Sequence, residues 1–246
     1  MTAQALQEIS QYGPVSTWLG GDRILELLSA GGQKPPTSGA SGVLSFRSYS
    51  DFAAALQAGP LGPSVGGVLL DLEHWSFTPQ DEQMDPSHYE SEFVNQARSA
   101  GLEPILAPGM DLVQARGPSG GSQADAFLSL GIAAGAARAL GGASGYVELQ
   151  SQSTERDPTQ YASFVSSASE QVIAADPSAT VLAGLSTNPP GGPVDISELA
   201  ADVAATRSMV SGYWLNVPDP GSSCPGCGPA DPALGASLLK MEAAKG

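Results

Sequence analysis

Short apolar or β-branched runs alternate along the whole chain with longer alanine-rich stretches, and this alternation restricts the possible folds more than any other feature. It is typical of βαβ units, in which each helix returns the chain to the same end of a parallel sheet. The short runs predict seven strands, near residues 14–19, 42–48, 66–73, 104–111, 145–152, 180–188 and 212–217. The longer stretches predict helices at 22–30, 50–58, 86–100, 122–140, 158–175, 195–208 and 232–244. Three of these helices begin with an Asp-Pro signal, an N-cap followed by proline in the first turn: Asp85-Pro86, Asp157-Pro158 and Asp231-Pro232.

Seven strand–helix units without a linker-like break predict an α/β fold, a single (β/α) TIM-like barrel formed by residues 1–246. An eighth strand is not evident, so we expect the barrel to be incomplete or irregular. A doubly wound open sheet is the alternative. The chain has no GxGxxG after its first strand and no GxxxxGK[ST] anywhere, so no nucleotide cofactor is expected.

The charge balance is strongly acidic, with 25 Asp and Glu against 10 Lys and Arg and a net charge of −15. Such a field repels polyanions, so neither nucleic acid nor an anionic membrane surface is an expected partner. No apolar run approaches the roughly 18–20 residues of a membrane span. The first residues lack the basic and apolar regions of a signal peptide, which predicts a cytoplasmic protein as written, or a secreted one if a signal has been removed.

The two cysteines, Cys224 and Cys227, form a CxxC within a stretch of glycine and proline. Redox motifs of this type act at the N-terminus of a helix, and a zinc site needs further ligands. The pattern therefore favours a loop staple or inert thiols, with redox and metal roles as the alternatives.

The stretch VLLDLEHW, residues 68–75, ends a predicted buried strand with Asp71 and Glu73 two residues apart. Side chains alternate along a strand, so both carboxylates point to the same side. Burying two of them is unfavourable unless they are paired or used in chemistry. His74 has the opposite parity and is expected to pack outward under a helix, and His88 is expected on a solvated helix face. Neither histidine suits a catalytic triad.

Barrel enzymes place their chemistry at the C-terminal ends of the strands. The same alternation brings further polar and aromatic side chains to that rim. Those expected there are Trp18, Arg47, Trp75, Asp111, Glu148, Gln150, Gln152, Asn188, Trp214 and Asn216. Carboxylates, amides and indoles suit general acid–base chemistry on a neutral, hydroxyl-rich small molecule or carbohydrate.

The strand-terminal D-x-E of residues 71–73, preceded by a glycine-led apolar strand and followed by Trp75, resembles the motif of chitinase-type TIM-barrel glycoside hydrolases. The resemblance implies that Glu73 is the proton donor, that Asp71 supports it and that Trp214 floors a sugar pocket. The longer motif of that family has two further acids upstream, where this chain has glycine and leucine at residues 67 and 69. The string from residue 71 to 83 is also similar to uncharacterised bacterial barrel proteins, which implies a fold but no activity.

The leading hypothesis is a hydrolase acting on glycosides, in which Glu73 is the general acid/base, Asp71 tunes it and Glu148 is the nucleophile or base. One alternative is a lyase, isomerase or cyclase that uses the same carboxylates, with Mg²⁺ held by these three acids. Another is a barrel that binds carbohydrate without turning it over. In every case burial and mutual repulsion are expected to raise at least one pKa of the Asp71–Glu73 pair, and Arg47 on the neighbouring strand is expected to oppose that shift.

Overall fold

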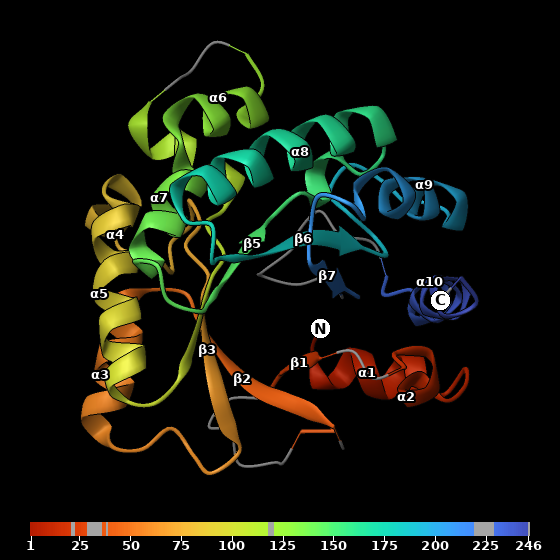
Figure 1. The fold of residues 1–246 in the computed structure, drawn as a ribbon, viewed down its shortest axis with the longest axis horizontal. Helices are drawn as coiled ribbons and strands as arrows, with labels where there is room; N and C mark the ends of the chain where they lie inside the picture. The colour runs from red at the N-terminus through yellow and green to blue at the C-terminus, as the bar shows by residue number, and fades with distance from the viewer. Residues whose placement is uncertain (21–22, 29–35, 38, 118–120, 219–228, 246) are drawn as a thin grey trace.

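The structure is a computed structural model that describes residues 1–20, 23–28, 36–37, 39–117, 121–218 and 229–245. A single parallel sheet runs through it, and its strands lie side by side in the order of the chain. The strands are β1 (Ile24–Leu27), β2 (Ala40–Phe46), β3 (Val65–Leu70), β4 (Glu103–Leu106), β5 (Tyr146–Leu149), β6 (Thr180–Ser186) and β7 (Gly212–Asn216). The sheet curls into a half-barrel with helices on its outer side (Figure 1). The predicted TIM-like α/β architecture is therefore confirmed.

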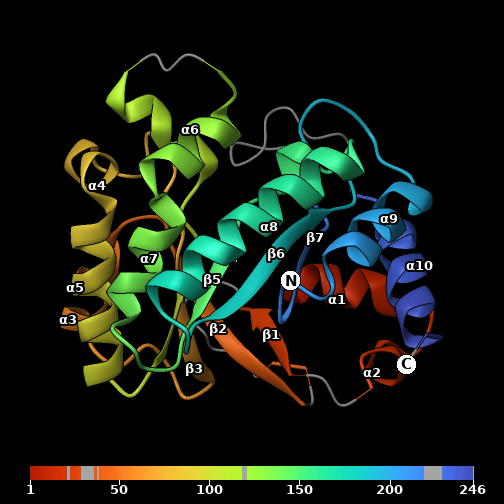
Figure 2. The ribbon, with the colours of Figure 1, turned by 45° about the horizontal axis from the view of Figure 1, so that its top comes forward.

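Helices surround most of the outer side of the sheet. In chain order they are α1 (Ala3–Ser10), α2 (Val15–Trp18), α3 (Tyr49–Ala58), α4 (Gln80–Met84), α5 (Pro86–Ser99), α6 (Gln123–Leu130), α7 (Ile132–Leu140), α8 (Pro158–Ala175), α9 (Ile196–Thr206) and α10 (Pro232–Ala243). Two 3-10 helices, η1 (Met110–Arg116) and η2 (Gln152–Thr154), follow the ends of β4 and β5. Figures 1 and 2 show α3, α4 and α5 along one flank, and α1, α2 and α10 together on the other.

Two predicted elements near the N-terminus are wrong. The predicted strand 14–19 is the single turn of α2, and β1 lies inside the predicted helix 22–30. The run of Leu and Glu in β1 has good helix propensity, but pairing with β2 in a parallel register overrides that local preference. The predicted helix 122–140 is two helices, because Gly131 takes a left-handed conformation (φ 62°) between α6 and α7.

The Asp-Pro start signals are confirmed at all three predicted positions. Asp85, Asp157 and Asp231 each accept a hydrogen bond from a backbone N–H in the first turn of α5, α8 and α10. Each cap satisfies a donor that has no partner within its own helix.

Alternation along the strands divides the apolar residues into two cores. The larger core lies between the outer face of the sheet and the helices, and its members include Phe52, Phe93 and Tyr161. The smaller core fills the interior of the half-barrel with Val43, Leu69, Ile105, Ala107, Tyr146, Leu182 and Trp214. In the described part of the chain, no helix is long and apolar enough to cross a membrane. The predictions for Cys224 and Cys227 concern residues outside the described ranges.

Glu90, on the core-facing side of α5, is a buried acid without compensation. Its side chain is 1% exposed, and both carboxylate oxygens lack a hydrogen-bond partner among the described residues. Burial raises its pKa well above the usual value, so the folded protein holds this carboxyl protonated. The unfolded chain releases that proton at about pH 4.3. The contribution of Glu90 to stability is therefore lost as the pH rises from that value through the pKa of the folded state.

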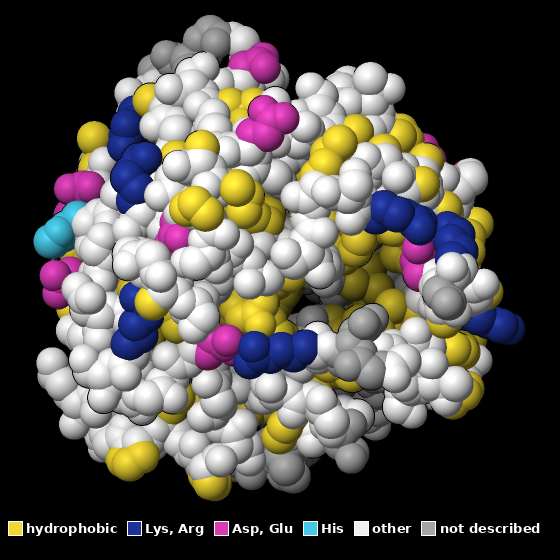
Figure 3. Space-filling view, viewed as in Figure 1, with side chains coloured by type: hydrophobic (Ala, Val, Ile, Leu, Met, Phe, Trp, Pro, Cys, Tyr) yellow, Lys and Arg dark blue, Asp and Glu magenta, His cyan; other side chains and the backbone are white. Residues whose placement is uncertain are grey.

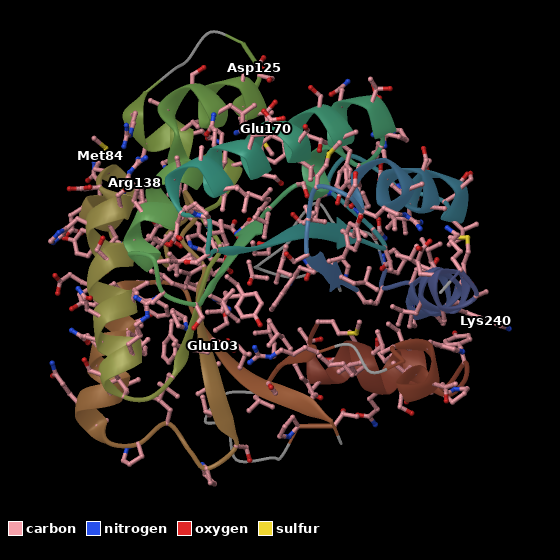
Figure 4. The ribbon with its side chains drawn as sticks, viewed as in Figure 1. Met84, Glu103, Asp125, Arg138, Glu170 and Lys240 are labelled. Atoms are coloured by element: carbon pink, nitrogen blue, oxygen red, sulfur yellow. The ribbon has the colours of Figure 1, made fainter. Side chains whose placement is uncertain are left out.

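We expect Glu90→Met to raise the free energy of unfolding by about 1–3 kcal/mol at pH 8, because it removes an uncompensated buried polar group. The gain should be smaller at pH 5, where less charge is desolvated on folding. Urea denaturation at both pH values measures this difference. Glu170→Met on the exposed face of α8 (labelled in Figure 4) is the matched control and should change stability by less than about 0.5 kcal/mol. Destabilisation of Glu90→Met at both pH values would contradict this account.

Candidate active site

Backbone pairing extends beyond the end of β3 and places the two central acids. The Asp71 N–H donates to the Phe46 carbonyl oxygen at 2.8 Å, and the Gly109 N–H donates to the Leu72 carbonyl oxygen at 2.7 Å. The chain from residue 71 to 73 is thus held between the last residue of β2 and the segment that follows β4. Alternation then points Asp71 and Glu73 to the same side, as the sequence predicts.

The side chains of Asp71 and Glu73 lie side by side, and each carboxyl shifts the pKa of the other. Gln150, directly after β5, donates its side-chain N–H to Asp71 Oδ1 at 2.7 Å and to the Ala107 carbonyl oxygen at 2.9 Å. Segments following three neighbouring strands therefore meet at this pair. Two adjacent buried carboxyls repel each other when both are ionised, and this repulsion favours a state in which one of them carries a proton.

Asp111, in the first turn of η1, is the third acid of the cluster. Its Oδ1 accepts a hydrogen bond from the His74 N–H at 3.0 Å. A Cβ atom added to Gly109 would lie 2.7 Å from Asp111 Oδ1 and 2.7 Å from Glu73 Cγ, so these two acids meet over the bare glycine backbone. A larger residue at Gly109 would push them apart.

Arg47, directly after β2, stacks on the rings of Trp75 and Phe77 beside these acids, and these three side chains form an aromatic platform. Its guanidinium carbon lies 4.3 Å from the ring centre of Phe77 and 5.5 Å from that of Trp75, within cation–π range. The Trp75 indole N–H donates to Thr78 Oγ1 at 2.7 Å, and the Thr78 hydroxyl donates to the Arg47 carbonyl oxygen at 2.7 Å. Thr78 therefore links the Trp75 side chain to the backbone of Arg47 by two hydrogen bonds.

The electrostatics separate the roles of the two paired acids. Burial raises the pKa of Asp71, while the hydrogen bond from Gln150 and the charge of Arg47 lower it. Burial raises the pKa of Glu73 further, and the charges of Asp71 and Asp111 add to that rise. Glu73 therefore holds its proton more tightly than Asp71, and Asp71 is the member that ionises first. As expected from the sequence, the charge of Arg47 opposes the rise in pKa, and it acts on Asp71.

Glu148 lies deeper in the half-barrel than the sequence suggested. It is 2% exposed, and its Oε1 has no hydrogen-bond partner among the described residues. Burial, followed by the charges of Asp71 and Glu73, raises its pKa well above the usual value. A Cβ atom on Gly184 would lie 2.7 Å from Glu148 Oε1 and 2.4 Å from Gln152 Nε2, so Gln152 reaches the same position.

The remaining predicted rim residues have internal partners. Asn188 is buried and donates to the Pro229 carbonyl oxygen at 2.8 Å. The Trp214 indole N–H donates to Asn216 Oδ1 at 3.2 Å, and Trp214 itself belongs to the interior core. The placement of Trp18 at the rim is wrong, because the predicted strand is the helical turn α2. Trp18 instead lines a cavity together with the starts of β5, β6 and β7.

The loop after β3 contributes more than the sequence indicated. The Gln83 side chain donates to the carbonyl oxygens of Trp75 and Thr78 and contacts His74 Nδ1 at 2.6 Å. His74 is exposed and bound to this glutamine, so the expectation that it packs under a helix is wrong. The 1% exposed Glu82 caps α3 by accepting hydrogen bonds from the first N–H groups of that helix. The unusual length and acidity of this segment were the only signal in the sequence.

The Mg²⁺ alternative needs Asp71, Glu73 and Glu148 to converge on one ion. Glu148 is 2% exposed, and Gln150 donates a hydrogen bond to Asp71. Within the described ranges, no cluster of three or more His, Cys, Asp or Glu side chains has the geometry to hold a metal ion.

Comparison with known proteins yields only distant structural similarity. No protein-family model matches the chain, and neither does any curated protein. A candidate alpha-L-fucosidase from Bacteroides thetaiotaomicron matches with a TM-score of 0.47 and 10% identity over 80% of this chain and 60% of its own. The carboxyl transferase domain of Rhizobium etli pyruvate carboxylase, with pyruvate, matches with a TM-score of 0.45 and 12% identity over 96% of this chain and 42% of its own. A sugar phosphate isomerase/epimerase from Parabacteroides distasonis matches with a TM-score of 0.33 and 9% identity over 99% of this chain and 91% of its own. These values assign no activity. The chain spans less than two thirds of the length of the first two of these proteins.

The site predicts a measurable effect of removing the Arg47 charge. Arg47→Met keeps the apolar stem against Phe77 but deletes the guanidinium, so the pKa of Asp71 should rise. Carboxyl ¹³C NMR titration of the wild type and variant measures this shift. Arg138→Met, on the exposed surface of α7 (labelled in Figure 4), should leave the Asp71 titration unchanged. An unmoved Asp71 titration in folded Arg47→Met would show that Arg47 does not act on the pair.

Proposed function

We propose that this protein hydrolyses glycosides by general acid catalysis, with Glu73 as the acid. The observation that carries the proposal is the close placement of Asp71, Glu73 and Asp111, in which burial and the neighbouring acids raise the pKa of Glu73 further than that of Asp71. A carboxyl that keeps its proton near neutral pH can donate it to the oxygen of a leaving group. Asp71 ionises first, and its negative charge keeps the proton on Glu73 until the leaving-group oxygen accepts it.

The second carboxylate of the reaction is best assigned to Asp111. Glu148 is fully buried with a strongly raised pKa, and a protonated carboxyl is a poor nucleophile or base. Asp111 is less buried and meets Glu73 across Gly109. Close pairing favours the retaining geometry, in which the carboxyls are about 5–5.5 Å apart, over the inverting geometry of about 6.5–9.5 Å.

The platform of Arg47, Trp75 and Phe77 is the surface that binds the sugar in this proposal. Aromatic faces and guanidinium N–H groups together bind the apolar faces and hydroxyls of a pyranose ring. The guanidinium of Arg47 beside the acids is already stacked on two aromatic rings. The surrounding acids oppose an anionic substrate, so a neutral or amine-bearing sugar is favoured.

Glu73→Gln tests the acid role. On an oligosaccharide with an alcohol leaving group we expect kcat/KM to fall by about 10²–10⁴-fold, the usual contribution of a positioned general acid. The loss should be much smaller on a dinitrophenyl glycoside, whose leaving group needs no proton. Steady-state kinetics on both substrate types measure the contrast, and Glu170→Gln is the control. Equal losses on both would remove Glu73 from the acid role, and a wild type that cleaves no member of a broad glycoside panel would overturn the proposed function.

The assignment of the second carboxylate predicts opposite results for two isosteric variants. Asp111→Asn should lower kcat by at least about 10²-fold, because it removes the nucleophile. Glu148→Gln should stay within about 10-fold of the wild type, because the native carboxyl is already neutral. Proton NMR of the first-formed sugar should show retained anomeric configuration. Loss of activity in Glu148→Gln with Asp111→Asn unaffected would return the role to Glu148.

A further inference from the structure

His74 lies in a tight turn between the acid pair and the aromatic platform. The Trp75 N–H donates to the Glu73 carbonyl oxygen at 3.0 Å, which closes the turn around this residue. The His74 N–H donates to Asp111 Oδ1 at 3.0 Å, so the same turn meets the proposed second carboxylate. The imidazole is exposed, and it therefore lies at the surface beside groups that the proposed reaction uses.

The orientation of the buried Gln83 amide is fixed by its hydrogen bonds. Its nitrogen lies 2.9 Å from the Trp75 carbonyl oxygen and 2.6 Å from the Thr78 carbonyl oxygen. Both of these oxygens can only accept, so a flipped amide would place its own oxygen against two acceptors. Gln83 Oε1 is consequently the atom that contacts His74 Nδ1 at 2.6 Å.

This contact decides which nitrogen of the His74 ring carries the proton. Gln83 Oε1 can only accept, so His74 Nδ1 is the donor. In the neutral ring Nε2 then has no hydrogen and presents a lone pair. Within the described ranges Nε2 has no hydrogen-bond partner, and the side chain is exposed. Gln83 thus holds a free acceptor atom in a fixed direction.

The ring acts on the acid cluster electrostatically. Burial raises the pKa of Asp111, while the hydrogen bond from the His74 N–H and the charge of the His74 ring lower it. A sugar bound at Asp111 and Glu73 would therefore lie close to the imidazole. Each hydroxyl of such a sugar is a donor that needs an acceptor when it leaves water, and a ring nitrogen with a lone pair supplies one.

This acceptor is remote from the cavity that Trp18 lines. The cavity, a hollow with hydrophobic walls in Figure 3, lies at the starts of β5, β6 and β7, whereas His74 follows the end of β3. In a parallel half-barrel the starts and the ends of the strands lie at opposite ends. Changes in specificity that follow from substitution of His74 therefore report on the acid cluster and not on this cavity.

We propose that His74 Nε2 accepts a hydrogen bond from one hydroxyl of the sugar bound at the acid cluster, and that His74 thereby helps to select the substrate. This role rests on the proposed function, because it needs a sugar at the acid cluster. Gln83 already restricts the rotation of the ring, so the hydrogen bond forms with little further loss of side-chain freedom.

Two variants of His74 separate this role from a structural one. Asparagine keeps a donor near the position of Nδ1, where it can still bind Gln83, whereas glutamine keeps an acceptor near the position of Nε2. The measurement is kcat/KM on a glycoside that the wild type cleaves and on the set of its monodeoxy analogues. The ratio between the parent glycoside and each analogue shows which hydroxyl the protein recognises.

We expect the wild type to lose about 3–10-fold in kcat/KM on one analogue, the loss that one neutral hydrogen bond supports. His74→Gln should retain most of this preference, and His74→Asn should lose it. The ratios at the other deoxy positions should not change in either variant. His88→Asn is the matched control and should keep every ratio, because His88 is exposed on α5 and its ring has no hydrogen bond within the described ranges.

Imidazole ¹⁵N NMR tests the acceptor without any substrate, and the chain has only these two histidines. In the neutral state His74 should carry its proton on Nδ1, whereas His88 should favour Nε2, as free histidine does. A neutral His74 with its proton on Nε2 would overturn the proposed acceptor, whatever the wild type cleaves.

The kinetic outcomes distinguish this role from the proposed function. A preference that His74→Asn retains and His74→Gln loses would overturn the role, because the ring would then act only through Gln83. Equal ratios in the wild type and His74→Asn would do the same while leaving glycoside hydrolysis intact. A wild type that cleaves no glycoside, although His74 carries its proton on Nδ1, would overturn the proposed function and this role with it.

Discussion

The backbone hydrogen bonds that carry β3 past its last residue are the constraint on which the candidate site depends. They hold residues 71–73 between the last residue of β2 and the segment that follows β4. An extended chain at this point sends Asp71 and Glu73, which are two residues apart, to the same side. Gln150 then fixes their orientation from the next strand but one. The geometry of a short extension of the sheet thus decides which carboxyls lie next to each other.

The protein carries several acids whose burial lowers its stability above mildly acidic pH. Glu90 and Glu148 are almost inaccessible and have unpaired oxygens within the described chain. Glu155 is similar, since burial raises its pKa to about 9 although one oxygen accepts the Ser186 N–H at 2.8 Å. Of these, only Glu148 lies beside the proposed site.

Much of this arrangement follows from simple alternation in the sequence. The parity of residues along β3 and β5 predicts that Asp71, Glu73 and Gln150 point into the same opening, and the parallel sheet brings them together. What failed depends on contacts distant in sequence. Pairing with β2 makes a strand of a segment that favours a helix, and the same change places Trp18 far from the acids.

Depth and loop contacts were also beyond the sequence pattern. Alternation says that Glu148 points inward, but not that it lies below the carboxyl pair with no access to solvent. Nor does it show that Gln83 binds two carbonyl oxygens of its own loop, or that Glu82 caps a helix more than thirty residues earlier. Such contacts depend on the path of a loop, which no periodicity encodes.

The hydrogen bonds of that loop have a kinetic consequence. Thr78 and Gln83 join the aromatic platform to the end of β2, and Glu82 joins it to the start of α3. The platform is therefore part of the rigid scaffold and not a lid that closes over a ligand. Association should then follow a single diffusive step, without the slow gating phase that enzymes with mobile lids show in rapid-mixing experiments.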